Sequence, residues 1–177
     1  MVRQQRGDAI FRIVGRSPTA EVRRLARLPG VEVLGEVRDV GEQIDRFSLS
    51  VAPLRIGRGV QNKVLESMAA GKPVVLTTAA AEGLKVRDQV DCVIADSPEV
   101  MAAQVVRLLA DTEARIRIGR YGRGYVRRDH RWPDALAELQ RVIEDRPPAA
   151  CELHAAPPVA EGYRGANSLE QSALRSV

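Results

Sequence analysis

Short apolar runs alternate with segments of helical period along most of the chain. Runs of strand length that contain Val, Ile and Leu cover residues 9–14, 31–34, 47–52, 73–76 and 91–94. Between and after them, apolar residues recur at helical spacing, which predicts helices over 18–27, 39–46, 60–70, 97–110, 112–128 and 133–144. Strands separated by helices are typical of an α/β fold with a doubly wound, Rossmann-like parallel sheet.

Residues with strong capping preferences mark the ends of these helices. Ser97 followed by Pro98 predicts a helix start, because serine caps the first turn and proline fits there. Ser17 and Pro18 repeat that pattern. Gly71 predicts the end of the helix over 60–70, since glycine adopts the left-handed conformation that terminates helices.

Length and composition predict one folded domain followed by a tail. The chain has 177 residues, of which 45% are hydrophobic and only 3% aromatic, so Ala, Val and Leu must fill the core. We place the domain at residues 1–146. Residues 147–177 are rich in Pro, Ala and small polar residues and lack a sustained period, which predicts a disordered tail.

The formal net charge is +4, and all basic residues except Lys63, Lys72 and Lys85 are arginine. Arginine suits anionic ligands through its planar guanidinium, although genomic base composition explains the same bias equally well. We see no concentrated basic run interleaved with aromatic residues. The sequence therefore gives no support to nucleic-acid binding, while an anionic surface remains an open alternative.

Cysteine and histidine are too few and too scattered for a metal site. Cys92 and Cys151 lie far apart, and there are two histidines. Cys92 lies in an apolar run and is expected to be a buried thiol. We expect no metal and no cofactor. The polar N-terminus lacks a signal-peptide core, and no apolar run approaches the roughly 20 residues of a membrane span. We expect a cytoplasmic chain, with attachment to the inner face of the membrane left open.

The segment from residue 49 to 77 reads as strand, glycine-bearing loop, helix, glycine stop and second strand. Its loop carries Arg55, Gly57, Arg58 and Gly59. At such a turn the helix N-terminus presents free N–H groups and a partial positive charge, which favours an anion. The loop matches neither the Walker pattern nor the dinucleotide fingerprint, so an ordinary strand-to-helix turn remains the alternative.

The helix predicted over 60–70 has two faces. Val60, Val64, Leu65 and Met68 fall on one arc, and the polar side chains fall on the other, namely Asn62, Lys63 and Glu66. Glu66 lies roughly 9 Å along the axis from Val60, about the offset between a bound diphosphate and its ribose hydroxyls. The alternative is a solvated face with a Lys63–Glu66 ion pair.

The remaining polar and aromatic residues suggest no catalytic set. Glu82 and Gly83 form another strand-exit loop at the same sheet edge, or a plain turn. His130 and Trp132 fit a helix boundary and a packing anchor better than chemistry. We expect three aspartates to be scattered and solvated, namely Asp88, Asp91 and Asp96.

Residues 11–132 resemble the C-terminal, donor-binding half of a two-domain GT-B glycosyltransferase of the family-4 type. The resemblance rests on segments that follow the family's order: FRIVGRSP, VEVLGEVRDV, VAPLRIGRGVQNKVLESMAAGKPVVLTT and AAAEGL. The amino-acid sequence of these segments most resembles that of sugar transferases in bacterial exopolysaccharide and exosortase (PEP-CTERM) systems.

This resemblance implies a glycosyltransferase domain that binds a nucleoside-diphosphate sugar linked to UDP or GDP, for transfer to a glycan or lipid-linked acceptor. It implies that Glu66 binds the ribose. The other implied donor-binding residues are those of the strand-exit loops and the helix start: Gly15, Arg16, Val37, Arg38, Arg55, Gly57, Arg58, Gly59, Val60, Asn62 and Lys63.

Two departures from the family pattern limit what this chain is expected to do alone. Arg58 occupies the position where many relatives carry a second glutamate. The family also has an N-terminal domain, and a strand and helix before the region that matches Phe11; residues 2–8 look like the end of that helix. We therefore expect donor binding without catalysis and an open sheet edge. A module that pairs with a separate N-terminal half, and an arginine-rich binder of anionic surfaces, are the alternatives.

Overall fold

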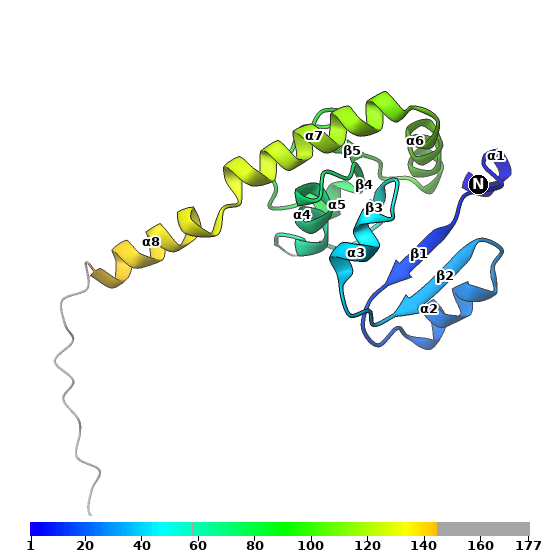
Figure 1. The fold of residues 1–177 in the computed structure, drawn as a ribbon, viewed down its shortest axis with the longest axis horizontal. Coiled ribbons are helices and arrows are strands. Elements are labelled where there is room, and N and C mark those ends of the chain that lie inside the picture. The colour runs from blue at the N-terminus through cyan, green and yellow to red at the C-terminus, as the bar shows by residue number, and fades with distance from the viewer. Residues whose placement is uncertain (58, 145–177) are drawn as a thin grey trace, which may run out of the picture. The chain divides into compact units, whose positions relative to one another are not determined.

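The computed structural model describes residues 1–57 and 59–144 (Figure 1). The chain divides into two compact units, Met1–Leu139 and Gln140–Val177, and the packing described below is that of the first. The domain boundary predicted at residue 146 and the predicted tail lie outside the described residues.

Strands and helices alternate much as the sequence predicts. The strands are β1 (Phe11–Val14), β2 (Val31–Gly35), β3 (Ser50–Ala52), β4 (Val74–Leu76) and β5 (Val93–Ile94). The helices are α1 (Val2–Gln5), α2 (Ala20–Arg24), the 3₁₀ turn η1 (Leu25–Arg27), α3 (Val40–Asp45), α4 (Asn62–Ala69), α5 (Thr78–Ala81), α6 (Pro98–Ala110), α7 (Thr112–Asp129) and α8 (Trp132–Glu144). Within the described residues, no helix is long and apolar enough to cross a membrane.

All strand pairs are parallel, which confirms the predicted α/β fold class. The strands form two sheets, however: β1 pairs with β2, and β4 lies between β3 and β5. The expected continuous sheet is therefore interrupted. No backbone hydrogen bond between described residues joins β1 or β2 to the other three strands.

Helix α4 is shorter than predicted because its first residues are not helical. Gly59 has a φ of +67° and Gln61 is extended, so the helix begins at Asn62. Val60 consequently lies outside the helix and is 44% exposed, and the predicted helical rise from Val60 to Glu66 does not exist. The predicted stop is correct: Gly71 has a φ of +73° and donates its N–H to the Met68 carbonyl at 2.8 Å.

Two other helices differ from the sequence prediction. The helix expected from Ser17 starts later, because Thr19 caps α2 through its side chain. Ser17 itself has a positive φ of 50°. The predicted loop after β4 contains the single helical turn α5, which Thr77 caps by accepting the N–H of Ala80 at 3.2 Å.

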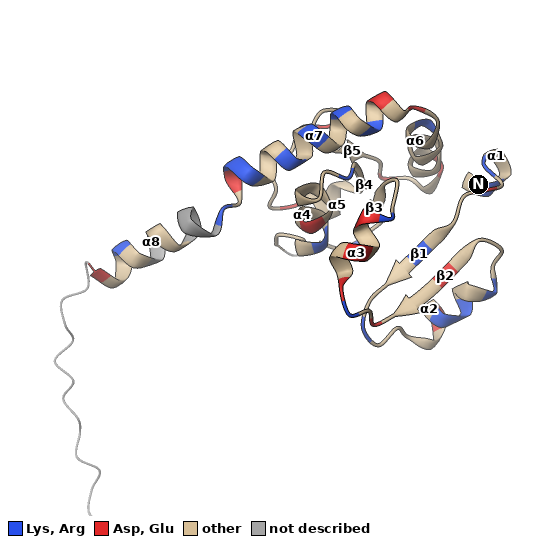
Figure 2. Cartoon of the chain, viewed as in Figure 1, with Lys and Arg blue, Asp and Glu red and all other residues tan. Residues whose placement is uncertain are grey.

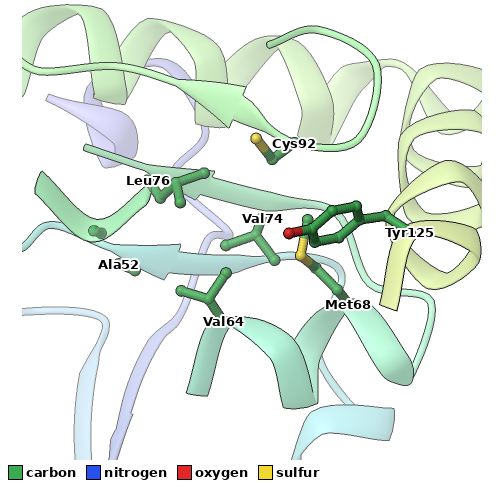
Figure 3. Packing of buried hydrophobic residues seen from close by; sticks show 8 residues of the cluster. Ala52, Val64, Met68, Val74, Leu76, Cys92 and Tyr125 are labelled. Atoms are coloured by element: carbon green, nitrogen blue, oxygen red, sulfur yellow. The ribbon is translucent and has the colours of Figure 1, made fainter. Parts of the chain in front are cut away.

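Apolar clusters cover both faces of the β3–β4–β5 sheet. On one face, Val74 and Leu76 pack with Val64 and Met68 of α4 and with Tyr125 of α7 (Figure 3). The other face buries an equally apolar set from the strands and from α6 and α7: Val75, Val93, Ala95, Val105, Leu108, Ala114 and Ile118. Both faces of a parallel sheet are normally buried in this way. As expected, Cys92 is fully buried, and burial raises the pKa of its thiol to about 12.

Asp91 is buried, which corrects the sequence reading of a solvated carboxylate, whereas Asp88 and Asp96 are exposed as expected and also accept hydrogen bonds. Asp91 is 2% exposed and accepts two bonds at 2.9 Å from the Arg87 guanidinium, an interaction that lowers the pKa of Asp91. Asp88 accepts the N–H of Ile94 at 2.7 Å. Asp96 bonds to Thr78. The spacing of apolar residues along the chain does not predict these hydrogen bonds, because their partners lie in turns and at the ends of other elements.

Candidate functional site

The predicted donor-binding residues that the structure describes lie in segments that follow the carboxyl ends of β1, β2 and β3. Gly15 and Arg16 follow β1, Val37 and Arg38 follow β2, and the loop 53–61 joins β3 to α4. In open parallel sheets this edge is where ligands bind.

The exits of β1 and β2 are held together by polar contacts. Gly15 donates its N–H to the Gly35 carbonyl at 2.9 Å. The exposed Arg16 forms an ion pair with Glu36 at 3.4 Å. Asp39 caps α3 by accepting the N–H of Gly41 at 2.7 Å, which fixes the end of the turn that carries Val37 and Arg38.

The loop after β3 lies against the turn after β4. A Cβ at Gly57 would come within 1.8 Å of the Ala79 carbonyl oxygen, so only glycine permits this approach. A Cβ at Gly83 would lie 3.5 Å from the backbone of Gly59 and Val60. The two loops singled out in the sequence therefore touch. Residue 58 lies outside the described residues.

Hydrogen bonds link the exits of all three strands in the larger sheet. Thr77 donates its hydroxyl to the Leu54 carbonyl at 2.6 Å. Thr78 donates its N–H at 2.7 Å and its hydroxyl at 2.8 Å to Asp96, and these bonds lower the pKa of that carboxyl. These bonds hold the three strand exits together at the carboxyl edge of the larger sheet.

An open hollow of about 580 Å³ lies next to these turns. It is lined by polar residues of the turn and by apolar residues beyond it: Thr78, Ala79, Ala81, Glu82, Gly83, Leu84, Val86 and Ile94. Glu82 is exposed, and its carboxylate lies 3.5 Å from where a Cβ on Gly57 would stand. The sequence places Glu82 in a strand-exit loop at this edge but assigns it no donor-binding role.

Helix α4 presents its polar face to solvent, as the angular spacing predicts. Asn62, Lys63 and Glu66 are exposed, whereas Val64 and Met68 are buried. The alternative Lys63–Glu66 ion pair does not form in the described structure. No side-chain hydrogen bond from the described residues caps α4.

The N-terminus of α4 therefore differs from those of the two long helices that follow. Ser97 caps α6 and Asp111 caps α7 through their side chains. The loop that contains Arg55 leads into α4. Free amides at a helix N-terminus favour an anion, and the exposed Arg55 adds a positive charge to the loop that precedes this helix.

Tyr125 and His130 contact each other beside Lys85, whose two chain neighbours line the hollow. The Tyr125 hydroxyl accepts the N–H of Lys85 at 3.0 Å and lies 2.8 Å from Nε2 of His130. Their rings meet edge to face. That His130 is not a general base stays a prediction from the sequence. The side chain of Trp132 is not among those described.

Basic residues are spread over several elements. Figure 2 shows Lys and Arg on α2, along α7 and in the connecting loops. Among residues 1–57 and 59–144, no group of three or more His, Cys, Asp or Glu side chains could hold a metal ion. Because basic residues are spread over the described surface, charge alone does not mark one site. The candidate site is distinguished from the rest of this surface by the geometry of the loop after β3.

Parallel strands that alternate with helices, and a glycine-bearing loop between β3 and α4, are features of Rossmann-like domains. Residues 1–111 match the family model described as glycosyl transferases group 1. The chain belongs to this family. A search of curated proteins found no matching sequence.

Solved structures with the same fold are distant in sequence. HepE from Anabaena in complex with UDP has a TM-score of 0.69 at 16% identity, over 78% of this chain and 41% of that one. TarM from S. aureus has a TM-score of 0.70 at 15% identity, over 80% and 30%. The C-terminal domain of LpcC from Francisella tularensis has a TM-score of 0.53 at 19% identity, over 63% and 60%. The chain thus spans about two fifths of HepE and less of TarM.

Proposed function

We propose that this chain binds the nucleoside-diphosphate part of a sugar donor at the loop 53–61 and the start of α4. The observation that carries the proposal is the uncapped N-terminus of α4 after a loop that carries the exposed Arg55, at the edge where ligands bind in parallel sheets. HepE has been solved with UDP and with UDP-glucose, which supports a nucleotide-sugar ligand for a chain of this fold.

Each predicted residue then has a distinct role. The amides of Asn62 and Lys63, with Arg55 and Arg58, neutralise the diphosphate, while Gly57 and Gly59 let the backbone approach it. Glu66, exposed one turn further along α4, accepts hydrogen bonds from the ribose hydroxyls. The turns after β1 and β2, which carry Gly15, Arg16, Val37 and Arg38, approach the base and the sugar.

The finer features of the function also belong to this proposal. The base is uracil or guanine, and the acceptor is a glycan or a lipid-linked glycan of an exopolysaccharide system. Residues 1–146 form the donor-binding domain, the chain acts in the cytoplasm or at the inner face of the membrane, and transfer requires an acceptor-binding domain. The chain's coverage of only 41% of HepE is consistent with that requirement.

Titration calorimetry with UDP, GDP and UDP-glucose tests the proposal. We expect saturable binding with a micromolar-to-millimolar Kd. The Glu66→Ala variant should bind at least about tenfold more weakly, a loss of about 1.4 kcal/mol. Glu113→Ala is the matched control, since it removes an exposed glutamate from α7 and should leave affinity unchanged. Unchanged affinity in Glu66→Ala, or no binding to a folded sample, would refute the proposed site.

A further inference from the structure

The outer face of α7 carries a row of arginines. Ala114, Ile118 and Tyr125 bury the opposite face of this helix in the two apolar clusters of the larger sheet. With about 3.6 residues per turn, four arginines fall within an arc of about 120° on the other side of α7 and span about 15 Å along its axis. Figure 2 shows the basic bands along the helix. This α7 basic face consists of Arg117, Arg120, Arg123 and Arg127.

The charges of the α7 basic face have no partner among the described residues. All four arginines are exposed, and none forms a side-chain hydrogen bond or an ion pair with another described residue. Arg115 of the same helix, by contrast, donates to the Leu108 carbonyl at 2.6 Å. Arg128 pairs with Asp129 at 2.8 Å. The α7 basic face thus presents guanidinium groups that the described packing does not use.

These four arginines account for the positive charge of the chain. The sequence has 27 basic and 23 acidic residues, so its formal net charge is +4. Without the α7 basic face, the remaining charges cancel. The only acidic residue on the same arc is Glu113, in the first turn of the helix. One surface of an otherwise neutral chain therefore attracts anions.

Two large apolar side chains share this exposed surface. Ile116 falls inside the arc of the arginines and is 65% exposed, and Tyr121 falls at its border and is 50% exposed. A tyrosine ring suits the boundary between hydrocarbon and water, because one end is apolar and the other is polar. Arginine at such a boundary covers apolar surface with its stem and keeps its charge in water.

An anionic lipid surface fits this combination of side chains. Guanidinium groups bind phosphate through paired hydrogen bonds. Helices that lie on membranes combine a basic face with exposed apolar side chains, and attraction to anionic lipids adds to the burial of apolar surface. Proteins that bind single-stranded nucleic acid stack successive bases on several aromatic side chains, whereas this face has one tyrosine.

We propose that the α7 basic face docks this chain on an anionic lipid surface, with Ile116 and Tyr121 at the level of the lipid headgroups. The face does not overlap the proposed donor site. Helix α7 meets the C-terminal end of α4, where a Cβ on Gly119 would clash with the Gly71 carbonyl oxygen. Donor binding is proposed at the opposite end of α4, so the lipid docking neither requires it nor blocks it.

Co-sedimentation of the full chain with vesicles tests the docking. The probes are vesicles of phosphatidylcholine alone and vesicles in which about a quarter of the lipid is phosphatidylglycerol. We expect at least about tenfold tighter binding to the anionic vesicles at about 0.1 M salt. Binding should fall at least about tenfold at about 0.5 M salt, because salt screens exposed charges. Equal binding to both kinds of vesicle, or no binding to either, would overturn the proposal.

A triple variant locates the binding surface. Arg117→Gln, Arg120→Gln and Arg127→Gln together remove three charges and leave Arg123, whose stem lies 3.8 Å from where a Cβ on Gly71 would stand. This variant should bind the anionic vesicles at least about tenfold more weakly. Circular dichroism establishes that it is folded. If it does not fold, the three single variants replace it, each with an expected loss of at least about twofold.

The matched control removes the same charge from other elements. It combines substitutions of three exposed arginines that also lack partners among the described residues, in α2, in η1 and after α3: Arg24→Gln, Arg27→Gln and Arg46→Gln. We expect this control to keep most of the vesicle affinity. Both triple variants have the same net charge, so an equal loss in the two would show general attraction and overturn the role of α7.

Two further measurements separate a lipid surface from other anions. Ile116→Ser combined with Tyr121→Ser should weaken vesicle binding at least about threefold and leave its salt dependence unchanged. Unchanged affinity in this double variant would contradict contact of these side chains with the headgroups. Short duplex DNA is the second probe. DNA binding as tight as vesicle binding, and lost equally in the α7 triple variant, would assign the face to nucleic acid and overturn the proposal.

Discussion

The two parallel sheets of the first unit have similar strand sequences but very different burial. Strand β4, with the sequence VVL, is completely buried between β3 and β5. Strand β1, with the sequence FRIV, has one strand neighbour and no buried residue. A short apolar run therefore predicts that a strand forms. The number of neighbouring strands decides how much of that strand is buried in the core.

The largest contrast should come from truncating one leucine in each sheet. Leu76 in β4 is fully buried, and Leu76→Ala should lower the free energy of unfolding by about 2–5 kcal/mol through lost burial and a cavity. Leu34 in β2 is 40% exposed, so Leu34→Ala should cost less than about 1 kcal/mol. Urea unfolding measures both. Equal losses would show that the two sheets are equally well packed.

A glycine pair in α7 tests how tightly the larger sheet is covered. A Cβ at Gly119 would come within 2.0 Å of the Gly71 carbonyl oxygen at the end of α4. Gly119→Ala should therefore destabilise the fold by about 1–3 kcal/mol. Gly124 has no atom within 4 Å of its added Cβ, so Gly124→Ala should be neutral or stabilise the helix by up to about 1 kcal/mol. Matching thermal unfolding curves for the two variants would contradict this packing.

The buried carboxylate beside β5 should make stability depend on pH. The bonds from Arg87 lower the pKa of Asp91 in the folded chain. Its stabilisation is therefore present above the unfolded pKa of about 4 and is lost as pH falls towards the folded pKa. Asp91→Asn should cost about 1–3 kcal/mol at pH 7 and flatten the acid limb of the stability curve. An unchanged acid limb would exclude Asp91 as its cause.

The smallest effect should come from the ion pair of the smaller sheet. Arg12 and Glu32 pair across β1 and β2 at 2.6 Å, with side chains 31% and 41% exposed. Arg12→Gln should cost only about 0.2–1 kcal/mol, and high salt should reduce that cost further because exposed pairs are screened. Urea unfolding at low and at high salt measures this loss of unfolding free energy. A loss as large as that of Asp91→Asn would show that the smaller sheet depends on its polar contacts as strongly as the larger one does.

Local signals in the sequence predicted the order and type of most elements. Ser97 and Pro98 begin α6, and Gly71 ends α4, because capping depends on the few residues around a helix end. The start of α4 was misplaced, since apolar Val60 fits the helical period although Gly59 adopts a positive φ. The turn α5 was missed, because its alanines carry no periodic signal.

The candidate site was only partly accessible from the sequence. The exposed face of Asn62, Lys63 and Glu66 follows from helical spacing. The contact between Gly57 and Ala79, and the bond from Thr78 to Asp96, join residues far apart in the chain. No local pattern distinguishes those residues from ordinary turn and surface positions.

The sequence by itself determined that this chain alternates strands and helices, places a glycine-bearing loop at a strand exit, and carries the motif order of the group 1 glycosyltransferase family. Periodicity, capping and motif order are local properties, so they can be read along the chain. Only the tertiary structure decided that the strands form two sheets and that Asp91 is buried rather than solvated. Burial and pairing depend on which distant segments become neighbours, and a linear pattern does not specify that.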